Sequence, residues 1–207
     1  MAQQTEYHLT ACPTNTTGLS VDCSCDHEQR HYLKLATISF VIFIGEFLGG
    51  CFSSSMALVS DSFHVLMDGT ENMISVIVSR LARKGADEKK IRGIGAKISA
   101  ILLFFIAISI VYEGYHRLFS PQKVEGYMIF VAFIGLLGNL WQRKIHQNAL
   151  HEHRNVTHFW QDMHLLSDIA TSVVVVIGGG IMLASEGHYW IDGVLSMGIG
   201  ALIMIFT

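Results

Sequence analysis

Charged residues and prolines are scarce in this chain. Only 15% of its 207 residues are Asp, Glu, Lys or Arg, and it contains two prolines. Soluble domains carry roughly 25% charged residues, so the deficit argues against a soluble globular protein. Hydrophobic residues make up 51% of the sequence, in runs long enough to cross a membrane. The lipid bilayer is therefore the first partner that the composition predicts.

Several other features are missing. The first 30 residues are polar, without an apolar core before a cleavage-like site, so we expect no signal peptide. No basic stripe with interleaved aromatic residues is present, so we expect no nucleic-acid partner. The four cysteines are poorly spaced for a secreted disulfide framework, and Cys23 and Cys25 are too close to pair comfortably. Free thiols facing a reducing compartment are the expected state.

Six apolar segments of about 20 residues each follow the polar start of the chain. The sequence therefore predicts an all-α, polytopic membrane protein with six transmembrane helices. Residues 1–30 are expected to form a flexible cytoplasmic arm, and residues 31–207 a single six-helix transmembrane domain. Because the chain stops at Thr207, directly after the last span, we expect no C-terminal soluble domain. The predicted spans are 32–52, 55–80, 96–117, 124–142, 159–184 and 189–206.

Lysine and arginine lie mainly on one side of the predicted spans. Of the 14 in the sequence, only Arg117 and Lys123 fall on the other side. The rest lie in the N-terminal arm and in the loops after the second and fourth spans. By the positive-inside rule, both termini are expected in the cytoplasm, with the protein in the inner or plasma membrane of the cell.

Two histidine–aspartate pairs stand in the second and fifth spans. His64 precedes Asp68 by four residues, and His164 precedes Asp168 by four. Residues at this spacing share one helix face, and both pairs fall near the bilayer midplane, where transporter sites are expected. An ionisable residue there costs roughly 3 kcal/mol or more and so usually has a partner or a task. Two imidazoles and two carboxylates can form a tetrahedral zinc site, although each pair could instead only pack or cap within its own helix.

The charges of these groups favour exchange of metal for protons. Zn²⁺ with two ionised aspartates and two neutral histidines has no net charge, and without the metal two protons on the histidines restore neutrality. A low-dielectric interior favours neutral ensembles, and histidine titrates near physiological pH. We therefore expect one Zn²⁺ to exchange for up to two protons. Asp61, three residues before His64, could accept a hydrogen bond from the imidazole or simply line the cavity.

These residues resemble the cation diffusion facilitator family, and its zinc transporter group in particular. The resemblance covers roughly residues 30–207 and rests on the two HxxxD motifs and on Asn139. It also rests on residues 45–50 (GEFLGG), 55–64 (SMALVSDSFH), 112–121 (YEGYHRLFSP) and 190–192 (WID).

The resemblance implies proton-coupled efflux of Zn²⁺ from the cytoplasm by alternating access, through a site formed by His64, Asp68, His164 and Asp168. In that family a histidine at the first position of the second-helix motif is associated with zinc preference, while Cd²⁺ or Co²⁺ stays open. Zn²⁺ is then a transported substrate, and no organic cofactor is expected. Members usually carry a cytosolic C-terminal domain that helps them dimerise, so a homodimer stays open here.

Two further groups could bind zinc on the cytoplasmic side. The thiols of Cys23 and Cys25 and the imidazole of His27 suit zinc, or they are incidental residues of a disordered arm. A second group resembles the family's histidine-rich loop between the fourth and fifth helices, and could raise the local zinc concentration or simply be solvated. It comprises His146, His151, His153 and His158.

Two other functional classes compete with transport. An intramembrane metalloenzyme would need a hydrolytic zinc site, which usually leaves one ligand position open and adds a general base, often within an HExxH motif. The one HExxH in the sequence, residues 27–31, lies before the first predicted span, and four protein ligands would close the sphere of the intramembrane site, so we expect a secondary active transporter rather than an enzyme. A metal sensor without transport is the other alternative.

Overall fold

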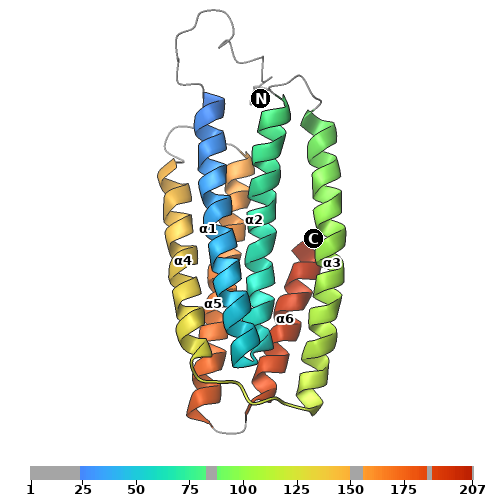
Figure 1. Cartoon of the computed structure of the whole chain (residues 1–207), viewed down its shortest axis with the longest axis vertical. Coiled ribbons are helices and arrows are strands. Elements are labelled where there is room, and N and C mark those ends of the chain that lie inside the picture. The colour runs from blue at the N-terminus through green and yellow to red at the C-terminus, as the bar shows by residue number, and fades with distance from the viewer. Residues whose placement is uncertain (1–23, 83–87, 150–155, 186–187, 207) are drawn as a thin grey trace, which may run out of the picture.

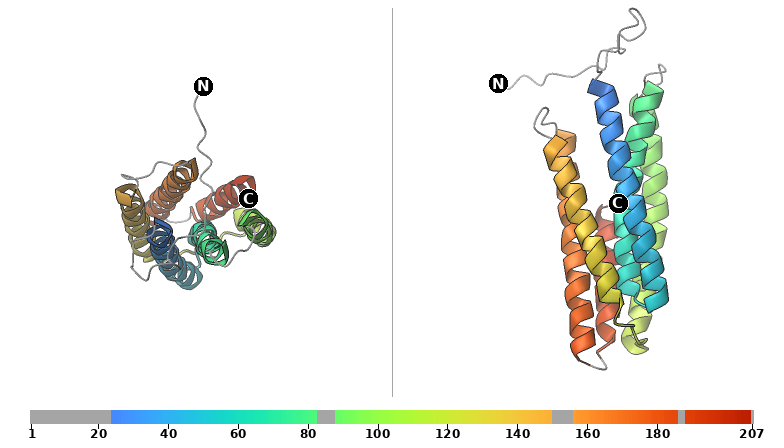
Figure 2. Two further views of the ribbon diagram at one scale, coloured as in Figure 1. Left: turned by 90° about the horizontal axis from the view of Figure 1, so that it is seen from above. Right: turned by 60° about the vertical axis from the view of Figure 1, so that its left-hand side comes forward.

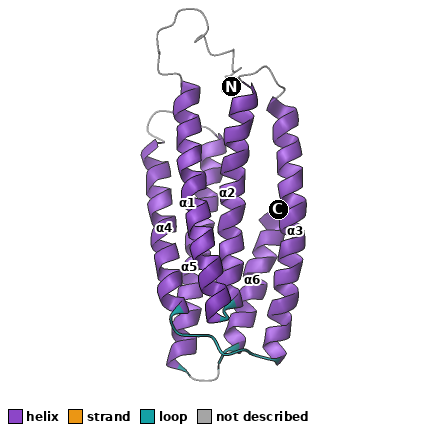
Figure 3. Cartoon of the chain, in the orientation of Figure 1, coloured by secondary structure: helices purple, strands orange, loops and turns teal. Residues whose placement is uncertain are grey.

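A computed structural model describes residues 24–82, 88–149, 156–185 and 188–206 of the chain. Over these ranges the chain is helical apart from short connections, and it contains no strand (Figure 3). The helices alternate in direction and pack side by side as one bundle (Figure 1). The prediction of an all-α architecture with six helices is confirmed. The helices are α1 (Ser24–Ser53), α2 (Met56–Ala82), α3 (Glu88–Phe119), α4 (Met128–Ala149), α5 (Val156–Ala184) and α6 (Trp190–Phe206).

Several helices extend beyond the apolar segments that predicted them. α1 begins at Ser24, so helical structure reaches into the stretch predicted as an arm, and α3 begins at Glu88 rather than at residue 96. Hydropathy marks only the part of a helix that matches the hydrocarbon layer, whereas backbone hydrogen bonding continues into polar ends. α4 begins four residues later than predicted, because turns precede it in which the Met128 N–H donates to Glu125 O at 3.1 Å.

Three of the described helices contain segments long and apolar enough to cross a membrane by themselves. These segments are Gln29–Ser53, Gly93–Phe119 and Asp162–Ala184, and α6 contains a shorter apolar stretch. α2 does not qualify, as its acidic residues and histidine predicted. A polar helix of this kind is stable in a membrane when its polar face points into the bundle, and α2 does contact four neighbours, α1, α3, α5 and α6.

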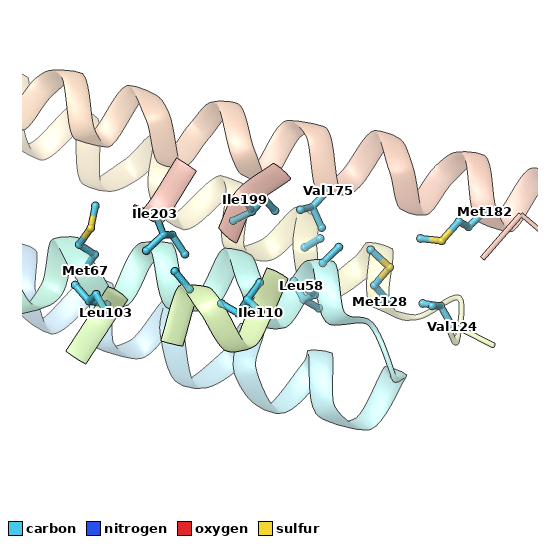
Figure 4. Close-up of a cluster of buried hydrophobic side chains, with 13 residues drawn as sticks. Leu58, Met67, Leu103, Ile110, Val124, Met128, Val175, Met182, Ile199 and Ile203 are labelled. Atoms are coloured by element: carbon cyan, nitrogen blue, oxygen red, sulfur yellow. The ribbon is translucent and has the colours of Figure 1, made fainter. Parts of the chain in front are cut away.

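The bundle has two parts that meet at α2. Seen from above in Figure 2, α1, α2, α4 and α5 surround a common centre, while α3 and α6 pack against each other at one side. A buried apolar cluster joins the two parts, and Figure 4 shows Leu58 and Met67 of α2 close to side chains from α3 and α6. The labelled members from those two helices are Leu103, Ile110, Ile199 and Ile203.

A tight reversal connects α1 to α2. Ser54 has a φ of 58°, in the left-handed region that commonly ends helices. The Ser55 N–H donates to Gly50 O at 3.0 Å and the Ser54 N–H to Cys51 O at 3.4 Å, the hydrogen-bond pattern of a Schellman motif. Ser55 Oγ then accepts from the Leu58 N–H at 3.2 Å and so caps α2. The start of the helix that carries His64 and Asp68 is therefore well defined.

Candidate metal centre

α2 and α5 place the four predicted ligands opposite one another. Because the two helices run in opposite directions, each histidine faces the aspartate of the other helix. His64 Nε2 lies 3.3 Å from Asp168 Oδ1, and His164 Nδ1 lies 3.9 Å from Asp68 Oδ1. The two motifs, a hundred residues apart in the sequence, therefore come together as two crossed pairs.

The crossed pairs do not yet form one coordination sphere. Among the described residues, no three side chains of His, Cys, Asp or Glu lie close enough together to hold a metal ion. Zinc sites place imidazole nitrogens and carboxylate oxygens about 2.0–2.2 Å from the metal, so the pairs would have to draw together around an ion. His64 Nε2 has a second neighbour, Ser167 Oγ, at 3.2 Å.

Three of the four side chains are fully inside the protein. Asp168 is 0% exposed and His64 and Asp68 are each 1% exposed, whereas the His164 side chain is 21% exposed. The two carboxyl groups interact electrostatically, and no group in the described part of the chain donates a hydrogen bond to either. Buried carboxylates without donors are costly, and their oxygens are suitable ligands for a cation.

Asp61 lies in a polar layer next to the crossed pairs. Its Oδ2 accepts a hydrogen bond from Ser172 Oγ at 2.9 Å, and Asn139 Nδ2 donates to the same serine at 3.0 Å. The partner of Asp61 is thus a hydroxyl of α5 rather than the His64 imidazole. α2, α4 and α5 are joined at this level by side-chain hydrogen bonds.

Glu46 of α1 completes this layer, although the sequence had not singled it out as a functional residue. It is 1% exposed, no described residue offers a hydrogen bond to either of its carboxyl oxygens, and it interacts electrostatically with Asp61. Its side chain occupies the space beside Gly135, where a Cβ atom would overlap Glu46 Oε1. The signal that could have revealed it is an acidic residue in the middle of an otherwise apolar span.

Asp192 of α6 anchors the start of α2. Its Oδ1 accepts from Ser55 Oγ at 2.7 Å and from the Ala57 N–H at 3.1 Å, and its Oδ2 accepts from the Met56 N–H at 2.8 Å. Arg117 Nη1 of α3 lies 3.1 Å from the same carboxylate. A carboxylate at a helix N-terminus is favourable because it meets free N–H groups and the positive end of the helix dipole.

Of the accessory candidates, the structure places only His146, which is buried near the end of α4. The side chains of the others fall outside the part of the chain that the structure describes; they are Cys23, Cys25, His27, His151, His153 and His158.

Six helices with buried, mutually facing ionisable groups between two of them define a polytopic membrane domain built around an internal polar site. The chain belongs to the cation efflux family, because the family model described as the cation efflux transmembrane domain matches residues 34–207. This confirms the resemblance predicted from the HxxxD motifs, and it places the chain in a family of transporters rather than enzymes.

Curated relatives are about 30% identical to this chain over the residues that align. The metal cation efflux system protein CzcD of Cupriavidus metallidurans is 33% identical over 191 residues, which cover 87% of this chain and 60% of that protein. The zinc transporter ZitB of Yersinia pseudotuberculosis is 30% identical over 194 residues, covering 90% of this chain and 62% of ZitB.

A third relative has a broader set of ions in its name. The cadmium, cobalt and zinc/H(+)-K(+) antiporter of Bacillus subtilis is 29% identical over 190 residues, covering 86% of this chain and 61% of that protein. The chain thus spans about three fifths of the length of the relatives that it matches.

Proposed function

We propose that this chain is the membrane domain of a secondary active transporter that moves Zn²⁺ out of the cytoplasm in exchange for protons. The observation that carries the proposal is the pair of crossed His–Asp contacts between α2 and α5. His64, Asp68, His164 and Asp168 are the proposed ligands of the transported ion.

The donor atoms support a transition-metal substrate. Two imidazoles with two carboxylates suit zinc, and four protein ligands close its tetrahedral sphere. Relatives of this chain are named as transporters of zinc, or of cadmium, cobalt and zinc. Zn²⁺ is the first substrate we propose, with Cd²⁺ and Co²⁺ as further candidates, because ligand softness alone does not separate these ions.

The charges at the centre support proton exchange. The described interior beside the crossed pairs holds no Lys or Arg side chain among its buried residues, so no basic group there offsets Asp68 and Asp168, whose two charges match those of a divalent cation. When the metal leaves, protons on His64 and His164 restore neutrality, which a low-dielectric interior favours.

The different burial of the four ligands supports a route into the site. The partly exposed His164 would meet an arriving ion first, and the buried His64, Asp68 and Asp168 would complete the sphere as α2 and α5 draw together. Release on the other side then requires the two helices to separate there, as in alternating access. The distribution of Lys and Arg supports cytoplasmic termini and a location in the cell membrane.

Zinc flux in proteoliposomes tests the proposal. We expect an imposed pH gradient to drive Zn²⁺ flux in the wild type, and we expect His164→Ala and Asp68→Ala each to abolish it. His116→Ala is the matched control, because His116 is an exposed histidine at the end of α3 and should retain wild-type flux. Absence of flux in well-folded wild-type protein would contradict transport and would favour a sensor or an enzyme.

Proton release on zinc binding tests the exchange itself. Detergent-solubilised wild-type protein should release between one and two protons per Zn²⁺ bound near neutral pH, because the histidines lose their protons when they bind metal. The release should disappear in the His64→Ala/His164→Ala variant. Zero release per zinc from the wild type across pH 6–8 would rule out metal-for-proton exchange.

A further inference from the structure

A second pair of histidines lies at the end of the bundle where α1 begins and α4 ends. His31 Nε2 of α1 is 3.2 Å from His146 Nδ1 of α4, and the ring centroids are 5.4 Å apart with an angle of 28° between the planes. His31 is 9% exposed and His146 is 0% exposed. Two imidazoles from different helices are thus held with one ring nitrogen of each facing the other.

The spacing of these nitrogens matches that of two ligands on one metal ion. Zinc holds imidazole nitrogens at about 2.0–2.1 Å with tetrahedral angles, so two such ligands lie about 3.3 Å apart. The observed 3.2 Å between His31 Nε2 and His146 Nδ1 differs from this value by a tenth of an ångström. An ion that replaces the proton between the two rings would thus find two nitrogens at the spacing it needs.

We propose that His31 and His146 form a second binding site for a divalent transition metal such as Zn²⁺, separate from the crossed pairs of α2 and α5. The separation follows from the helix register. Ser39 of α1 packs against Gly69 of α2, the neighbour of Asp68, so Ser39 marks the level of the crossed pairs. His31 precedes Ser39 by eight residues, or about 12 Å along α1. Between the two levels lies a buried apolar cluster of Tyr32, Leu35 and Val76.

The charges around the pair suit a cation. Asp162 of α5 interacts electrostatically with His146. Arg143, the nearby basic residue of α4, is already bound to Asp162, with its Nε 3.0 Å from Oδ1 and its Nη2 3.2 Å from Oδ2. Its positive charge is therefore largely neutralised by a carboxylate and does not stand alone beside the histidines.

A site with two protein ligands is suited to transient binding of an ion rather than to tight, long-lived binding. With only two protein ligands, binding is weaker and exchange faster than in a site with four protein ligands. Resting on the transport proposed above, this site would receive an ion before it reaches His164. The binding itself does not depend on that transport.

Zinc binding to the full-length chain in detergent tests the site. A background with Asp68→Ala and Asp168→Ala removes the proposed transport ligands, and equilibrium dialysis with Zn²⁺, repeated with Co²⁺ for its absorption spectrum, measures what is left. In this background we expect His31→Ala and His146→Ala each to lower the affinity of one site about tenfold or more. Because both side chains hold the same ion, the double variant should lose no more than either single variant.

The controls and the contradicting results are equally specific. His116→Ala and His188→Ala change exposed histidines at the opposite end of the bundle and should leave zinc binding unchanged. The pair is only a hydrogen-bonded contact, and the proposal is wrong, if both single variants bind zinc within twofold of the background. It is equally wrong if their effects add, since each histidine would then bind its own ion. If the wild type shows no zinc flux but still binds zinc at this site, the transport proposal is refuted and the proposal of a second site is not.

Discussion

Single acidic residues organise the interior of this bundle. Glu46, Asp61, Asp68 and Asp168 are each at most 1% exposed, and the buried residues that the structure describes include no Lys or Arg. Several carboxyl groups in a low-dielectric region without basic partners create a strongly negative potential when ionised. The interior is therefore suited to hold cations or protons, and the net charge of the interior depends on which of these is bound.

Gly135 is predicted to be required for the position of Glu46. In Gly135→Ala the new methyl group would overlap Glu46 Oε1, and the buried glutamate or its helix must shift. Overpacking of a buried site costs about 1–3 kcal/mol, so thermal unfolding in detergent should show a lower Tm for this variant. Because the polar layer adjoins the crossed pairs, we also expect its zinc flux to fall.

Gly180→Ala is the matched control. A Cβ atom at Gly180 meets nothing within 4 Å, and replacing a glycine inside a helix by alanine gains roughly 0.5–1 kcal/mol. The control should therefore be as stable as the wild type or slightly more stable. Equal Tm values for the two variants would show that Glu46 is not confined by Gly135.

At the scale of helices, α3 and α6 are joined by direct backbone contact. A Cβ atom at Gly193 would lie 2.7 Å from Gly114 O, and one at Gly114 would lie 2.9 Å from Gly193 O. Close backbone approach through small residues is a common way for membrane helices to associate, because dispersion contacts drive their packing. These contacts hold α3 and α6 together as a closely packed pair.

Gly193→Ala is expected to separate α3 from α6. A backbone oxygen cannot move aside as a flexible side chain can, so the helices must part and the Tm should fall by several degrees, in keeping with a cost of about 1–3 kcal/mol. Gly198→Ala, on the same helix, meets nothing within 4 Å and should leave the Tm unchanged or raised. A Gly193→Ala variant as stable as Gly198→Ala would contradict the contact.

The sequence predicts the helices better than it predicts what lies between them. The apolar segments gave the number and order of the helices, because burial in lipid requires about 20 apolar residues whatever the neighbours are. The HxxxD spacing placed each His and Asp on one face of its own helix. The crossing of the pairs, His64 with Asp168 and His164 with Asp68, depends on the antiparallel register of α2 and α5, which spacing along one helix does not contain.

Other contacts could not be predicted from the sequence for the same reason, since they also depend on how separate helices pack against each other. Glu46 beside Gly135 and His31 beside His146 are contacts of α1 with α4, which lie about a hundred residues apart. Nothing local in either helix requires them. The extension of α1 back to Ser24 was also missed, because hydropathy ends where the hydrocarbon layer ends, whereas the helix continues. The four ligands and the cytoplasmic termini stay predictions.

For the whole molecule, the distribution of basic residues predicts one orientation in the membrane. Lys90, near the start of α3, is exposed, and Lys123, in the connection before α4, is 71% exposed. In a background with the four cysteines replaced by serine, Lys123→Cys should react with a membrane-impermeant maleimide on intact cells. Lys90→Cys should react only after permeabilisation. The reverse labelling pattern would place both termini outside.

The carboxylate that anchors α2 belongs to the last helix, more than 130 residues further along the chain. During synthesis, α2 therefore leaves the ribosome and enters the membrane while its first N–H groups still lack that partner. Only when α6 has been inserted does Asp192 reach Ser55 and Arg117 and complete the start of α2. The start of the helix that carries His64 and Asp68 is thus completed by a residue that is synthesised and inserted after every other helix of the bundle.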